Sequence, residues 1–471
     1  MSLMGTVLEK GTFIDEAKIA ALLEDVRTDP AEVRDILAKA REAKGLTLEE
    51  VTKLTAVTDP QLLEELFHTA RSVKETIYGN RIVLFAPLYI SNLCGNECAY
   101  CAFRSSNKEL KRRALNMDEI KREVTYLVNH GHKRLLVVAG EAYDTKHSLK
   151  YIYDAIEAIY SVKTPKGEIR RLNANIAPLS VEDFRDLKAT RIGTYQCFQE
   201  TYHRETYKKM HLRGRKADYD WRVTVMHRAM EAGIDDVGIG PLFGLYDWRF
   251  ELLATLLHVK SLEECFGVGP HTISFPRLEP ALGSTVAAAP PYPVSDVDFL
   301  KIIAITRLAV PYTGMILSTR ESGEFRDKCI SLGISQISAG SRVDPGGYEE
   351  SDNKKFDTSQ FQVGDYRTID EVILSLAQSG YIPSFCTACY RMGRTGCDFM
   401  DLAKPGEIKN HCFPNAVATF QEYLEDFASP ETKEAGEKVI AEVTDSLSGL
   451  AQERCRKFSE LVKSGKRDVI C

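Results

Sequence analysis

The stretch Ile82-Val83-Leu84-Phe85-Ala86-Pro87-Leu88-Tyr89-Ile90 is the first of a series of short apolar runs that decide the fold. This stretch is apolar, rich in β-favouring residues and of strand length, so it predicts a buried strand. From residue 81 to residue 339 similar short runs alternate with longer amphipathic stretches, which indicates parallel strands joined by crossover helices. The predicted strands are residues 82–90, 134–139, 170–176, 193–198, 235–239, 272–275, 313–317 and 335–339. Eight strand-helix units in about 260 residues have the size of an α/β (β/α)8 TIM barrel, and a doubly wound open sheet is the alternative.

Two segments of different character flank the predicted barrel. Residues 13–71 are charged and helical in pattern, and Pro30 and Pro60 favour helix boundaries near them. Helix starts are also predicted at Asn116, Ser180 and Thr368, because an acidic residue follows each of them three positions later. A polar loop is expected over residues 341–357, and from residue 381 onward four cysteines fall within 27 residues before a charged helical tail. We therefore predict an N-terminal helical extension (1–75), the barrel (76–380) and a mostly helical, metal-organised C-terminal domain (381–471).

The composition is that of a folded chain with no preference for nucleic acid. Hydrophobic residues make up 44% and charged residues 27% of the 471 residues, which is ordinary for a globular protein. The net charge of -6 argues against nucleic acid as the main partner, because phosphate binding needs a basic surface. No apolar run reaches the roughly 18 residues of a membrane span, and residues 1–24 lack the pattern of a signal peptide. We therefore expect a cytoplasmic protein that contacts no membrane.

Three cysteines follow the first predicted strand. Cys94, Cys98 and Cys101 form a Cys-x3-Cys-x2-Cys loop at the carboxyl end of that strand, the barrel face where catalysis takes place. Three thiolates on so short a loop can hold three irons of a [4Fe-4S] cluster and leave the fourth iron open. Zinc is the competing metal, but structural zinc sites usually take four ligands. Twelve cysteines in a chain without an export signal also favour metal use over disulfide bonds.

A second group of cysteines lies near the C-terminus. Cys386 and Cys389 form a Cys-x2-Cys pair, and both Cys397 and Cys412 follow it closely enough to supply a third ligand. Such a pair can bind zinc, act as a redox dithiol or form part of a second iron-sulfur site. The residues alone therefore predict a metal site and leave the metal and the third ligand open.

The first cysteine loop resembles the signature of the radical S-adenosylmethionine (SAM) superfamily. Tyr100, directly before the third cysteine, matches an aromatic position of that superfamily, and Ala139-Gly140-Glu141 resembles its Gly-Gly-Glu segment. The resemblance implies a [4Fe-4S] cluster on the three cysteines, with SAM on the open iron and its amino group near Gly140 and Glu141. Arg222 is a candidate for the SAM carboxylate, because a guanidinium binds carboxylates bidentately. A solvated helix residue is the alternative for Arg222.

The second group narrows the resemblance to the family of radical SAM tyrosine lyases that serve [FeFe]-hydrogenase maturation. Cys386, Cys389 and Cys412 match its Cys-x2-Cys-x22-Cys motif, and residues 238–244, 270–277 and 338–342 also resemble that family. The resemblance implies an auxiliary [4Fe-4S] cluster on these three cysteines and no ligand role for Cys397. It also implies an additional labile iron that His271 helps to hold, although His271 beside a proline is alternatively a packed residue.

The same resemblance implies the reaction and its partners. L-tyrosine would be cleaved to p-cresol and dehydroglycine, and dehydroglycine would be converted to CO and cyanide for the hydrogenase active site. The implied partners are L-tyrosine, an electron donor such as a ferredoxin or flavodoxin, and downstream hydrogenase maturation proteins. Two rival functions stay open at this point: another two-cluster radical SAM enzyme that acts on a different amino acid, and a non-catalytic iron-sulfur scaffold or carrier.

Candidate substrate residues follow the fourth and seventh predicted strands. Arg320 is a candidate for the tyrosine carboxylate, and Glu200 and Tyr202 are expected at the same end of the barrel. A surface ion pair with Glu321 or Glu324 is the alternative for Arg320. Capping or packing is the alternative for Glu200 and Tyr202.

Overall fold

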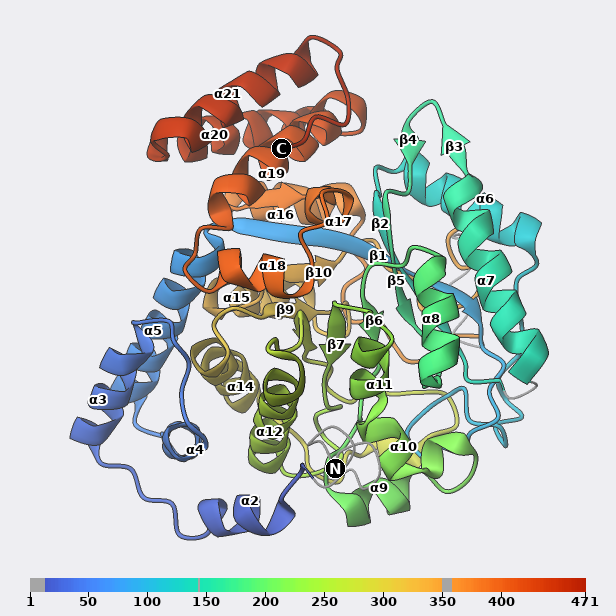
Figure 1. Ribbon diagram of the computed structural model, residues 1–471, viewed down its shortest axis with the longest axis vertical. Coiled ribbons are helices and arrows are strands. Elements are labelled where there is room, and N and C mark those ends of the chain that lie inside the picture. Colours follow the sequence, from blue (N-terminus) through green and yellow to red (C-terminus); the bar gives the residue numbers. More distant parts are fainter. Residues whose placement is uncertain (1–12, 143–144, 350–357) are drawn as a thin grey trace.

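Eight parallel strands close into a barrel at the centre of the molecule (Figure 1). The structure, a computed structural model, describes residues 13–142, 145–349 and 358–471. Within this part of the chain the barrel strands are β1 (Arg81–Ser91), β2 (Arg134–Ala139), β5 (Arg171–Asn175), β6 (Tyr195–Gln196), β7 (Val237–Ile239), β8 (Thr272–Ser274), β9 (Gly314–Leu317) and β10 (Gln336–Ser338). The pairing of β10 with β1, in the register Val83 to Gln336, closes the barrel. The predicted (β/α)8 barrel is therefore confirmed, and the open sheet is excluded.

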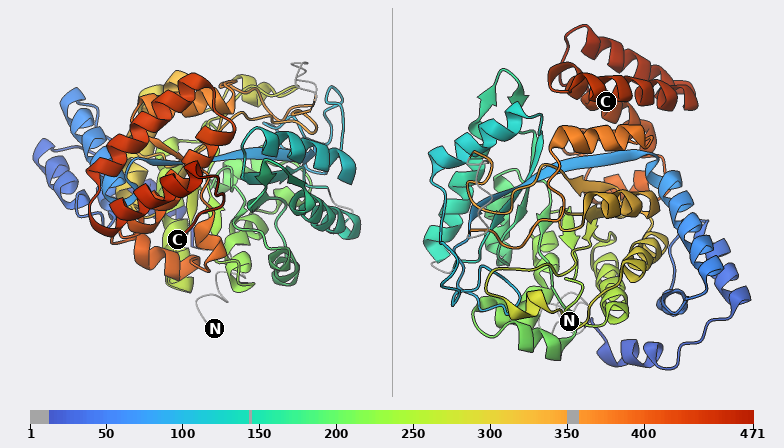
Figure 2. Two further views of the ribbon diagram at one scale, coloured as in Figure 1. Left: turned by 90° about the horizontal axis from the view of Figure 1, so that it is seen from above. Right: turned by 180° about the vertical axis from the view of Figure 1, so that it is seen from behind.

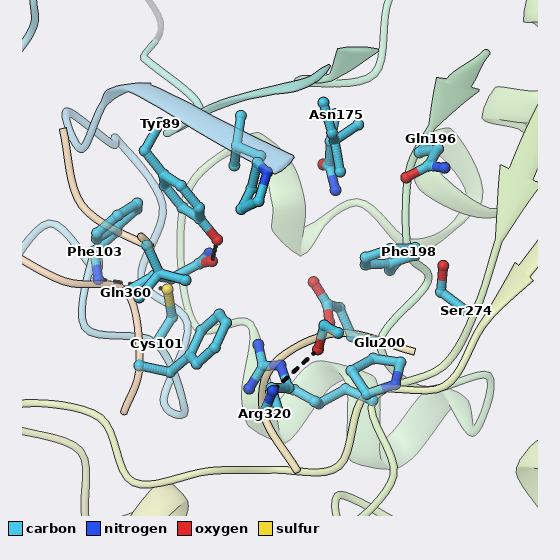
Figure 3. A pocket seen from close by; sticks show the side chains of 18 of the residues that line it. Tyr89, Cys101, Phe103, Asn175, Gln196, Phe198, Glu200, Ser274, Arg320 and Gln360 are labelled. Carbon is cyan, nitrogen blue, oxygen red and sulfur yellow. Dashed lines mark hydrogen bonds between the residues drawn. The ribbon is translucent and has the colours of Figure 1, made fainter. Parts of the chain in front are cut away.

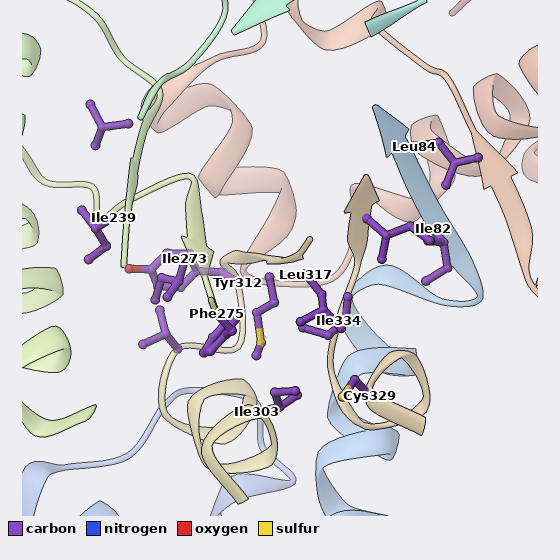
Figure 4. Close-up of a cluster of buried hydrophobic side chains, with 14 of the residues drawn as sticks. Ile82, Leu84, Ile239, Ile273, Phe275, Ile303, Tyr312, Leu317, Cys329 and Ile334 are labelled. Atoms are coloured by element: carbon purple, nitrogen blue, oxygen red, sulfur yellow. The ribbon is translucent and has the colours of Figure 1, made fainter. Parts of the chain in front are cut away.

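The alternation of side chains along β1 explains why this strand lies between two different environments. Ile82, Leu84 and Ala86 are buried in the cluster between the strands and the surrounding helices, part of which Figure 4 shows. Phe85 and Tyr89, with the opposite parity, line the lumen. Because successive side chains of a strand point to opposite faces, one apolar strand can supply both the outer core and the wall of a cavity.

The helices begin where the sequence predicts. Asn116 and Thr368 form complete capping boxes, and Ser180 accepts a hydrogen bond from the backbone N–H of Asp183. The helices between and after the barrel strands are α6 (Met117–Asn129), α7 (Thr145–Ser161), α8 (Val181–Ala189), α9 (Arg204–Met210), η1 (Arg215–Ala217), α10 (Tyr219–Val223), α11 (Val225–Glu231), α12 (Trp248–Phe266), α13 (Thr285–Ala288), α14 (Asp296–Ala309), α15 (Gly323–Leu332) and α16 (Ile369–Gln378). None of the helices in the described residues is both long and apolar enough to cross a membrane.

Within the described residues from 13 onward, four helices precede the barrel, where a helical segment was predicted. They are α2 (Glu16–Leu23), α3 (Pro30–Ala40), α4 (Leu48–Thr55) and α5 (Pro60–Tyr78). Pro30 and Pro60 occupy the first turns of α3 and α5, where a missing backbone N–H costs nothing. Helix α5 packs against α14 and α15, and α2 and α4 pack against α12. The extension therefore covers one side of the barrel wall (Figure 1).

The C-terminal segment covers the end of the barrel at which the strands begin. It starts with β11 (Ile382–Ser384), which pairs in parallel with the first residues of β1. It continues with α17 (Ala388–Arg391), α18 (Gly396–Ala403), α19 (Lys409–Asp426), α20 (Pro430–Ser446) and α21 (Gly449–Lys463). Helix α19 packs on β11 and α21, and α20 packs on α16, so the red helices in Figure 2 form a layer over that end.

The strand β11 and the hairpin of β3 (Lys163–Thr164) and β4 (Gly167–Glu168) were not predicted. None of them lies in an apolar run of strand length: β11 contains Pro383, which is uncommon inside strands, and β3 and β4 contain no apolar side chain. The predicted loop 341–357 is irregular up to residue 349, and residues 350–357 lie outside the described part of the chain.

Candidate active site and auxiliary site

A cavity with about 1400 Å³ of empty volume, part of it open to solvent, fills the upper lumen of the barrel. We call it the upper cavity. It lies at the carboxyl ends of the strands, the usual position of a barrel active site. Side chains from several strands and loops point into it, including Tyr89, Asn175, Gln196, Glu200 and Arg320 in Figure 3.

The loop after β1 brings its three cysteines to the wall of the upper cavity. Cys94, Cys98 and Cys101 all line it, and none of them is in a disulfide. Backbone hydrogen bonds hold the loop in place: Gly95 N–H donates to the carbonyl of Glu141 at 2.9 Å, and Ala99 N–H donates to that of Met210 at 2.9 Å. The three thiols therefore converge on one space although the loop contains no regular element.

The chemistry of these thiols fits a cationic cluster. Burial raises the pKa of the Cys94 thiol to about 11 and raises that of Cys98 above its ordinary value. A buried thiolate needs a compensating positive charge, and iron ions supply it. Three thiolates on one short loop can each bind a different iron, so the loop fits a cluster of several irons.

Tyr100 is buried beside the cysteine loop. Its hydroxyl lies 2.8 Å from Nε2 of His211, the residue that follows α9. The ring lines the upper cavity between the second and third cysteines. Tyr100 thus links the cysteine loop to the segment after α9 and stands at the edge of the space that the cluster and SAM would share.

Two of the predicted SAM residues contact each other. Nη1 of Arg222 donates to Oε1 of Glu141 at 2.8 Å, and Nδ2 of Asn96 donates to Oε2 of the same carboxylate at 2.8 Å. Arg222 also donates through Nε to the carbonyl of Phe198 at 2.7 Å. Arg222 is 5% exposed, so it is not the solvated helix residue of the alternative interpretation. The pair can present a carboxylate and a guanidinium side by side to the amino and carboxylate groups of an amino acid.

Gly140 is required by a close backbone approach. A Cβ atom at this position would lie 2.3 Å from the carbonyl oxygen of Leu93, directly before Cys94. We expect Gly140→Ala to push the end of β2 away from the cysteine loop, at a cost of about 1–3 kcal/mol in stability. The measurement is thermal unfolding together with SAM binding by equilibrium dialysis. Wild-type SAM affinity in Gly140→Ala would contradict this role. Gly267→Ala is the control: at this left-handed position (φ 74°) a Cβ meets nothing within 4 Å, so the change should lower stability through backbone strain alone and leave SAM binding unchanged.

Glu200 is held in an unusual backbone conformation at the cavity wall. Its φ of 70° lies in the left-handed region, which non-glycine residues avoid unless the surroundings impose it. Oε1 of Glu200 accepts a 2.5 Å hydrogen bond from Nζ of Lys216 and lies 3.8 Å from Nη2 of Arg222. The structure therefore brings Glu200, Lys216, Arg222 and Glu141 into one chain of alternating charges along the cavity.

Arg320 points into the upper cavity and has no carboxylate partner. Its guanidinium lies over the ring of Phe361 and donates weakly to the carbonyl of Arg277 at 3.4 Å. Glu321 instead pairs with Arg277, and Glu324 pairs with Lys328. Across the described part of the chain no carboxylate lies within salt-bridge distance of Arg320. The surface ion pair, which was the alternative for Arg320, is therefore wrong, and this guanidinium can bind a ligand carboxylate.

The structure does not bring Tyr202 to the upper cavity. Its ring is fully buried, and its hydroxyl lies 2.9 Å from Nδ1 of His258 on α12. Its backbone N–H donates to Glu251 at 2.9 Å. In a regular strand, side chains two residues apart point to the same face. The backbone between Glu200 and Tyr202 is irregular, so the two side chains point in different directions. Tyr202 is therefore a buried packing residue, and its predicted role in substrate binding is wrong.

A second cavity, with about 510 Å³ of empty volume, lies at the opposite end of the barrel, where the strands begin. We call it the auxiliary cavity. Cys386, Cys389 and Cys412 line it and are buried, whereas Cys397 is exposed. The two neighbouring thiols of Cys389 and Cys412 share one proton, which lowers the pKa of Cys412 and raises that of Cys389. The geometry therefore offers Cys412, and not Cys397, as the third thiol of this group.

Cationic side chains surround the auxiliary thiols. Arg81 and Arg134, from the first residues of β1 and β2, line the auxiliary cavity, and Arg134 donates to the carbonyl of Cys386 at 2.8 Å. The Nε atoms of both arginines are buried and have no hydrogen-bond acceptor within the described residues. Buried donors without acceptors are costly, so an anionic thiolate cluster would fit this lining.

His271, at the start of β8, also lines the auxiliary cavity. Burial lowers the pKa of its imidazole to about 4, which keeps the ring neutral near pH 7. Its Nδ1 lies 3.5 Å from Oδ1 of Asp236, and its Nε2 lies 3.3 Å from the hydroxyl of Tyr390. A neutral imidazole with an oriented ring is the form that ligates a metal.

Several cavity residues were missed from the sequence. Asn96, Lys216 and Glu279 line the upper cavity, and burial raises the pKa of Glu279 to about 7. Arg81, Arg134 and Tyr390 line the auxiliary cavity. Arg81 and Arg134 could have been found from the sequence, because each is a charged residue at the first position of a barrel strand and such residues can line the end of the lumen where the strands begin. No comparable pattern marks Lys216 or Tyr390.

Comparisons with known proteins agree with this arrangement. Residues 88–257 match the Radical SAM superfamily, and residues 274–382 match the Biotin and Thiamin Synthesis associated domain. The 2-iminoacetate synthase of Escherichia coli (strain K12) is 33% identical over 346 residues, which are 73% of this chain and 88% of that protein. A crystal structure of HydG, a maturase of the [FeFe]-hydrogenase, is 51% identical with a TM-score of 0.93, over 98% of this chain and 100% of that one.

The chain belongs to the HydG family of radical SAM tyrosine lyases. The HydG of Carboxydothermus hydrogenoformans is a further similar structure, with 42% identity and a TM-score of 0.80 over 92% of this chain and 94% of that one. The predicted fold, enzyme class and family resemblance are thereby confirmed. Membership also implies a [4Fe-4S] cluster and SAM as cofactors of this HydG-family chain, and it sets aside the scaffold and the different-substrate enzyme as rival functions.

Proposed function

We propose that this HydG-family chain cleaves L-tyrosine in the upper cavity and converts the amino-acid fragment to CO and cyanide in the auxiliary cavity. Cys94, Cys98 and Cys101 would hold the cluster that binds SAM, and Cys386, Cys389 and Cys412 an auxiliary [4Fe-4S] cluster. The observation that carries the proposal is the presence of two groups of three cysteines at opposite ends of one barrel lumen. When bound, the first cluster and SAM supply a radical that can remove a hydrogen atom from the substrate.

The residues around the upper cavity would bind and orient SAM and tyrosine. The Glu141 carboxylate, which Asn96 and Arg222 hold in place, suits the ammonium group of SAM. The Arg222 guanidinium suits the SAM carboxylate. Arg320, which also lines the upper cavity, suits the tyrosine carboxylate. Glu200 forms an ion pair with Lys216 at the wall of the upper cavity. Its carboxylate would orient the amino group of SAM or of tyrosine. The apolar walls from Phe85, Phe103 and Leu136 would exclude water from the reacting atoms.

In the auxiliary cavity the chain would supply charge balance and one further ligand. The two buried guanidinium groups of Arg81 and Arg134 would stabilise a negatively charged thiolate cluster. His271, kept neutral by burial, would help to hold an additional labile iron. The electron donor, such as a ferredoxin or flavodoxin, and the maturation proteins that receive the product complete the proposed set of partners.

The test of the proposed function is an anaerobic assay of the reconstituted protein with SAM, a reductant and L-tyrosine. We expect 5'-deoxyadenosine, p-cresol, cyanide and CO, each dependent on tyrosine. L-phenylalanine and L-tryptophan at the same concentration test whether the upper cavity is selective. Formation of 5'-deoxyadenosine with equal efficiency from another amino acid, without p-cresol from tyrosine, would refute the proposed substrate.

Arg320 provides a separate test of substrate binding. Hydrogen bonds to a charged group are worth about 1.5–3 kcal/mol, which corresponds to about 10- to 100-fold in affinity. We expect Arg320→Ala to raise the KM for tyrosine by this factor and Arg320→Lys to raise it less, because lysine keeps the charge and loses the bidentate geometry. SAM affinity should stay unchanged. A normal KM in Arg320→Ala would show that another group binds the carboxylate.

A further inference from the structure

A surface pocket lies directly beside the auxiliary cavity. It has about 860 Å³ of empty volume, and its lining includes Arg171, Lys188, Arg191, Asp236 and Tyr390. We call it the vestibule. Its residues come from the first positions of β5, from α8 and the loop after it, from the loop before β7 and from α17. The vestibule therefore opens at the end of the barrel that holds the auxiliary thiols, and not at the end that holds the upper cavity.

One aromatic side chain, that of Tyr390, lines both the vestibule and the auxiliary cavity. Its hydroxyl lies 3.3 Å from Nε2 of His271 and 3.5 Å from Oγ1 of Thr194, and the guanidinium of Arg171 lies over its ring. Tyr390 is also next to Cys389 in the sequence, so its side chain lies at the boundary between the vestibule and the space around the auxiliary thiols.

The charges of the vestibule favour an anion. Lys188 and Arg191 are exposed at its rim, and neither forms an ion pair with any residue that the structure describes. Arg171 is 2% exposed, and within the same described residues its Nη1 has no hydrogen-bond acceptor. A buried N–H without an acceptor is costly, and an anionic ligand would satisfy it.

The other charged residues of the vestibule already have partners. Asp235 accepts a hydrogen bond from Oγ1 of Thr395 at 3.2 Å, and Oδ1 of Asp236 accepts one from the backbone N–H of Gly396 at 3.3 Å. Oδ2 of Asp236 has no hydrogen bond within the described residues and lies 4.0 Å from Nη2 of Arg171, so Asp236 balances part of the Arg171 charge and leaves Nη1 of that guanidinium without a partner. Arg170 is paired with Glu422 and Asp468. The carboxylates thus anchor the turn between α17 and α18 to the barrel. Lys188, Arg191 and Nη1 of Arg171 are left as the positive groups available to a ligand.

We propose that the vestibule binds small anions and that Tyr390 is the partition through which they pass between solvent and the auxiliary cavity. This inference rests on the proposed function, in which the fragment is converted to cyanide and CO around the auxiliary thiols. The cyanide-containing product is anionic, and the vestibule offers it a short cationic route that avoids the upper cavity. Carboxylates of small metabolites share this chemistry and could enter by the same route.

The test compares an anionic and a neutral reagent of nearly equal size in the full-length, cluster-free protein. Iodoacetate and iodoacetamide alkylate the same thiols, and peptide mass spectrometry gives the rate at Cys386, Cys389 and Cys412 separately. Electrostatic steering changes association rates by about 10- to 1000-fold. We expect Lys188→Glu/Arg191→Glu to lower the iodoacetate-to-iodoacetamide rate ratio at the three auxiliary cysteines by about tenfold at low salt, and less at high salt. We expect Tyr390→Ala to raise the rates of both reagents there.

Internal and matched controls separate the route from general effects. Cys265, a partly exposed thiol on α12 that lines neither the vestibule nor the auxiliary cavity, should react equally in all variants. Lys108→Glu/Lys121→Glu makes the same change in net charge at exposed positions outside the vestibule and should leave the ratio unchanged. Tyr390→Phe keeps the ring and should keep the partition closed. An unchanged ratio in Lys188→Glu/Arg191→Glu, or unchanged rates in Tyr390→Ala, would overturn the proposal and indicate entry through the barrel lumen.

The alkylation assay involves no cluster and no turnover, so its outcome is independent of the proposed reaction. If the chain made no CO or cyanide, the proposed function would fail while the alkylation result stood. If CO and cyanide were formed normally and neither vestibule variant changed the alkylation rates, only the proposed route would fail.

Discussion

Cys98→Ala is expected to abolish the formation of 5'-deoxyadenosine from SAM, with a loss of at least about 10³-fold, equivalent to about 4 kcal/mol in the barrier. Cys98 is 4% exposed and lies between Cys94 and Cys101 on the wall of the upper cavity. Alanine removes one of three thiolates from a loop that has no fourth cysteine nearby, so the cluster would lose a ligand that the protein cannot replace. The measurement is chromatographic quantification of 5'-deoxyadenosine and p-cresol under anaerobic conditions.

Two comparisons make the result for Cys98→Ala specific. Cys265→Ala removes a half-buried thiol on α12 that lines neither cavity and should leave both products at wild-type levels. Iron bound at the C-terminal cysteines should persist in Cys98→Ala, because the two groups lie at opposite ends of the barrel. If Cys98→Ala still cleaved SAM at the wild-type rate, the assignment of the first cysteine loop would be refuted.

Cys412→Ala is expected to separate the two halves of the reaction. Formation of p-cresol should stay within about twofold of wild type, because substitutions at distant sites act independently. Release of CO should fall by at least about 100-fold, since Cys412 is one of the three buried thiols of the auxiliary cavity and a missing ligand affects every later step. Stopped-flow or carboxyhaemoglobin detection of CO, together with p-cresol from the same reaction, measures both halves.

Cys397 is the matched control for Cys412. It lies in the same segment, but its side chain is exposed and does not line the auxiliary cavity. Cys397→Ala should therefore make CO and p-cresol normally. Should Cys397→Ala lose CO while Cys412→Ala keeps it, the ligand set proposed for the auxiliary cluster would be wrong.

The fold could be predicted from the sequence because barrel strands are buried on both faces. Each of the eight predicted strands is present, with bounds that differ by a few residues, and the longest run became the longest strand, β1. The capping boxes at Asn116 and Thr368 were equally readable, because a cap depends on residues three positions apart. The strand β11 could not be predicted, because its three residues form a strand only by pairing with the first residues of β1.

The cavity residues that directly follow a predicted strand could be identified from the sequence, whereas those in irregular segments could not. Gly140 and Glu141 could be identified because they directly follow a predicted strand, and the structure places both beside the cysteine loop. Tyr202 was expected beside Glu200 and instead points into the helical layer, because the left-handed backbone of Glu200 redirects the chain. The direction of a side chain in an irregular segment depends on contacts with distant residues, in this case with His258 and Glu251.

The sequence by itself determined the barrel, the family resemblance and the identity of the two cysteine groups. These features depend on spacing within one strand or one loop, where covalent geometry already brings the residues together. The residues alone left Cys397 and Cys412 open as the third auxiliary ligand and the resemblance favoured Cys412; the tertiary structure places Cys412, and not Cys397, in the auxiliary cavity. Only the tertiary structure showed that Arg81, Arg134 and Tyr390 gather there. Cys389 lies in α17 and Cys412 in α19, with α18 between them, so their meeting depends on how these helices pack.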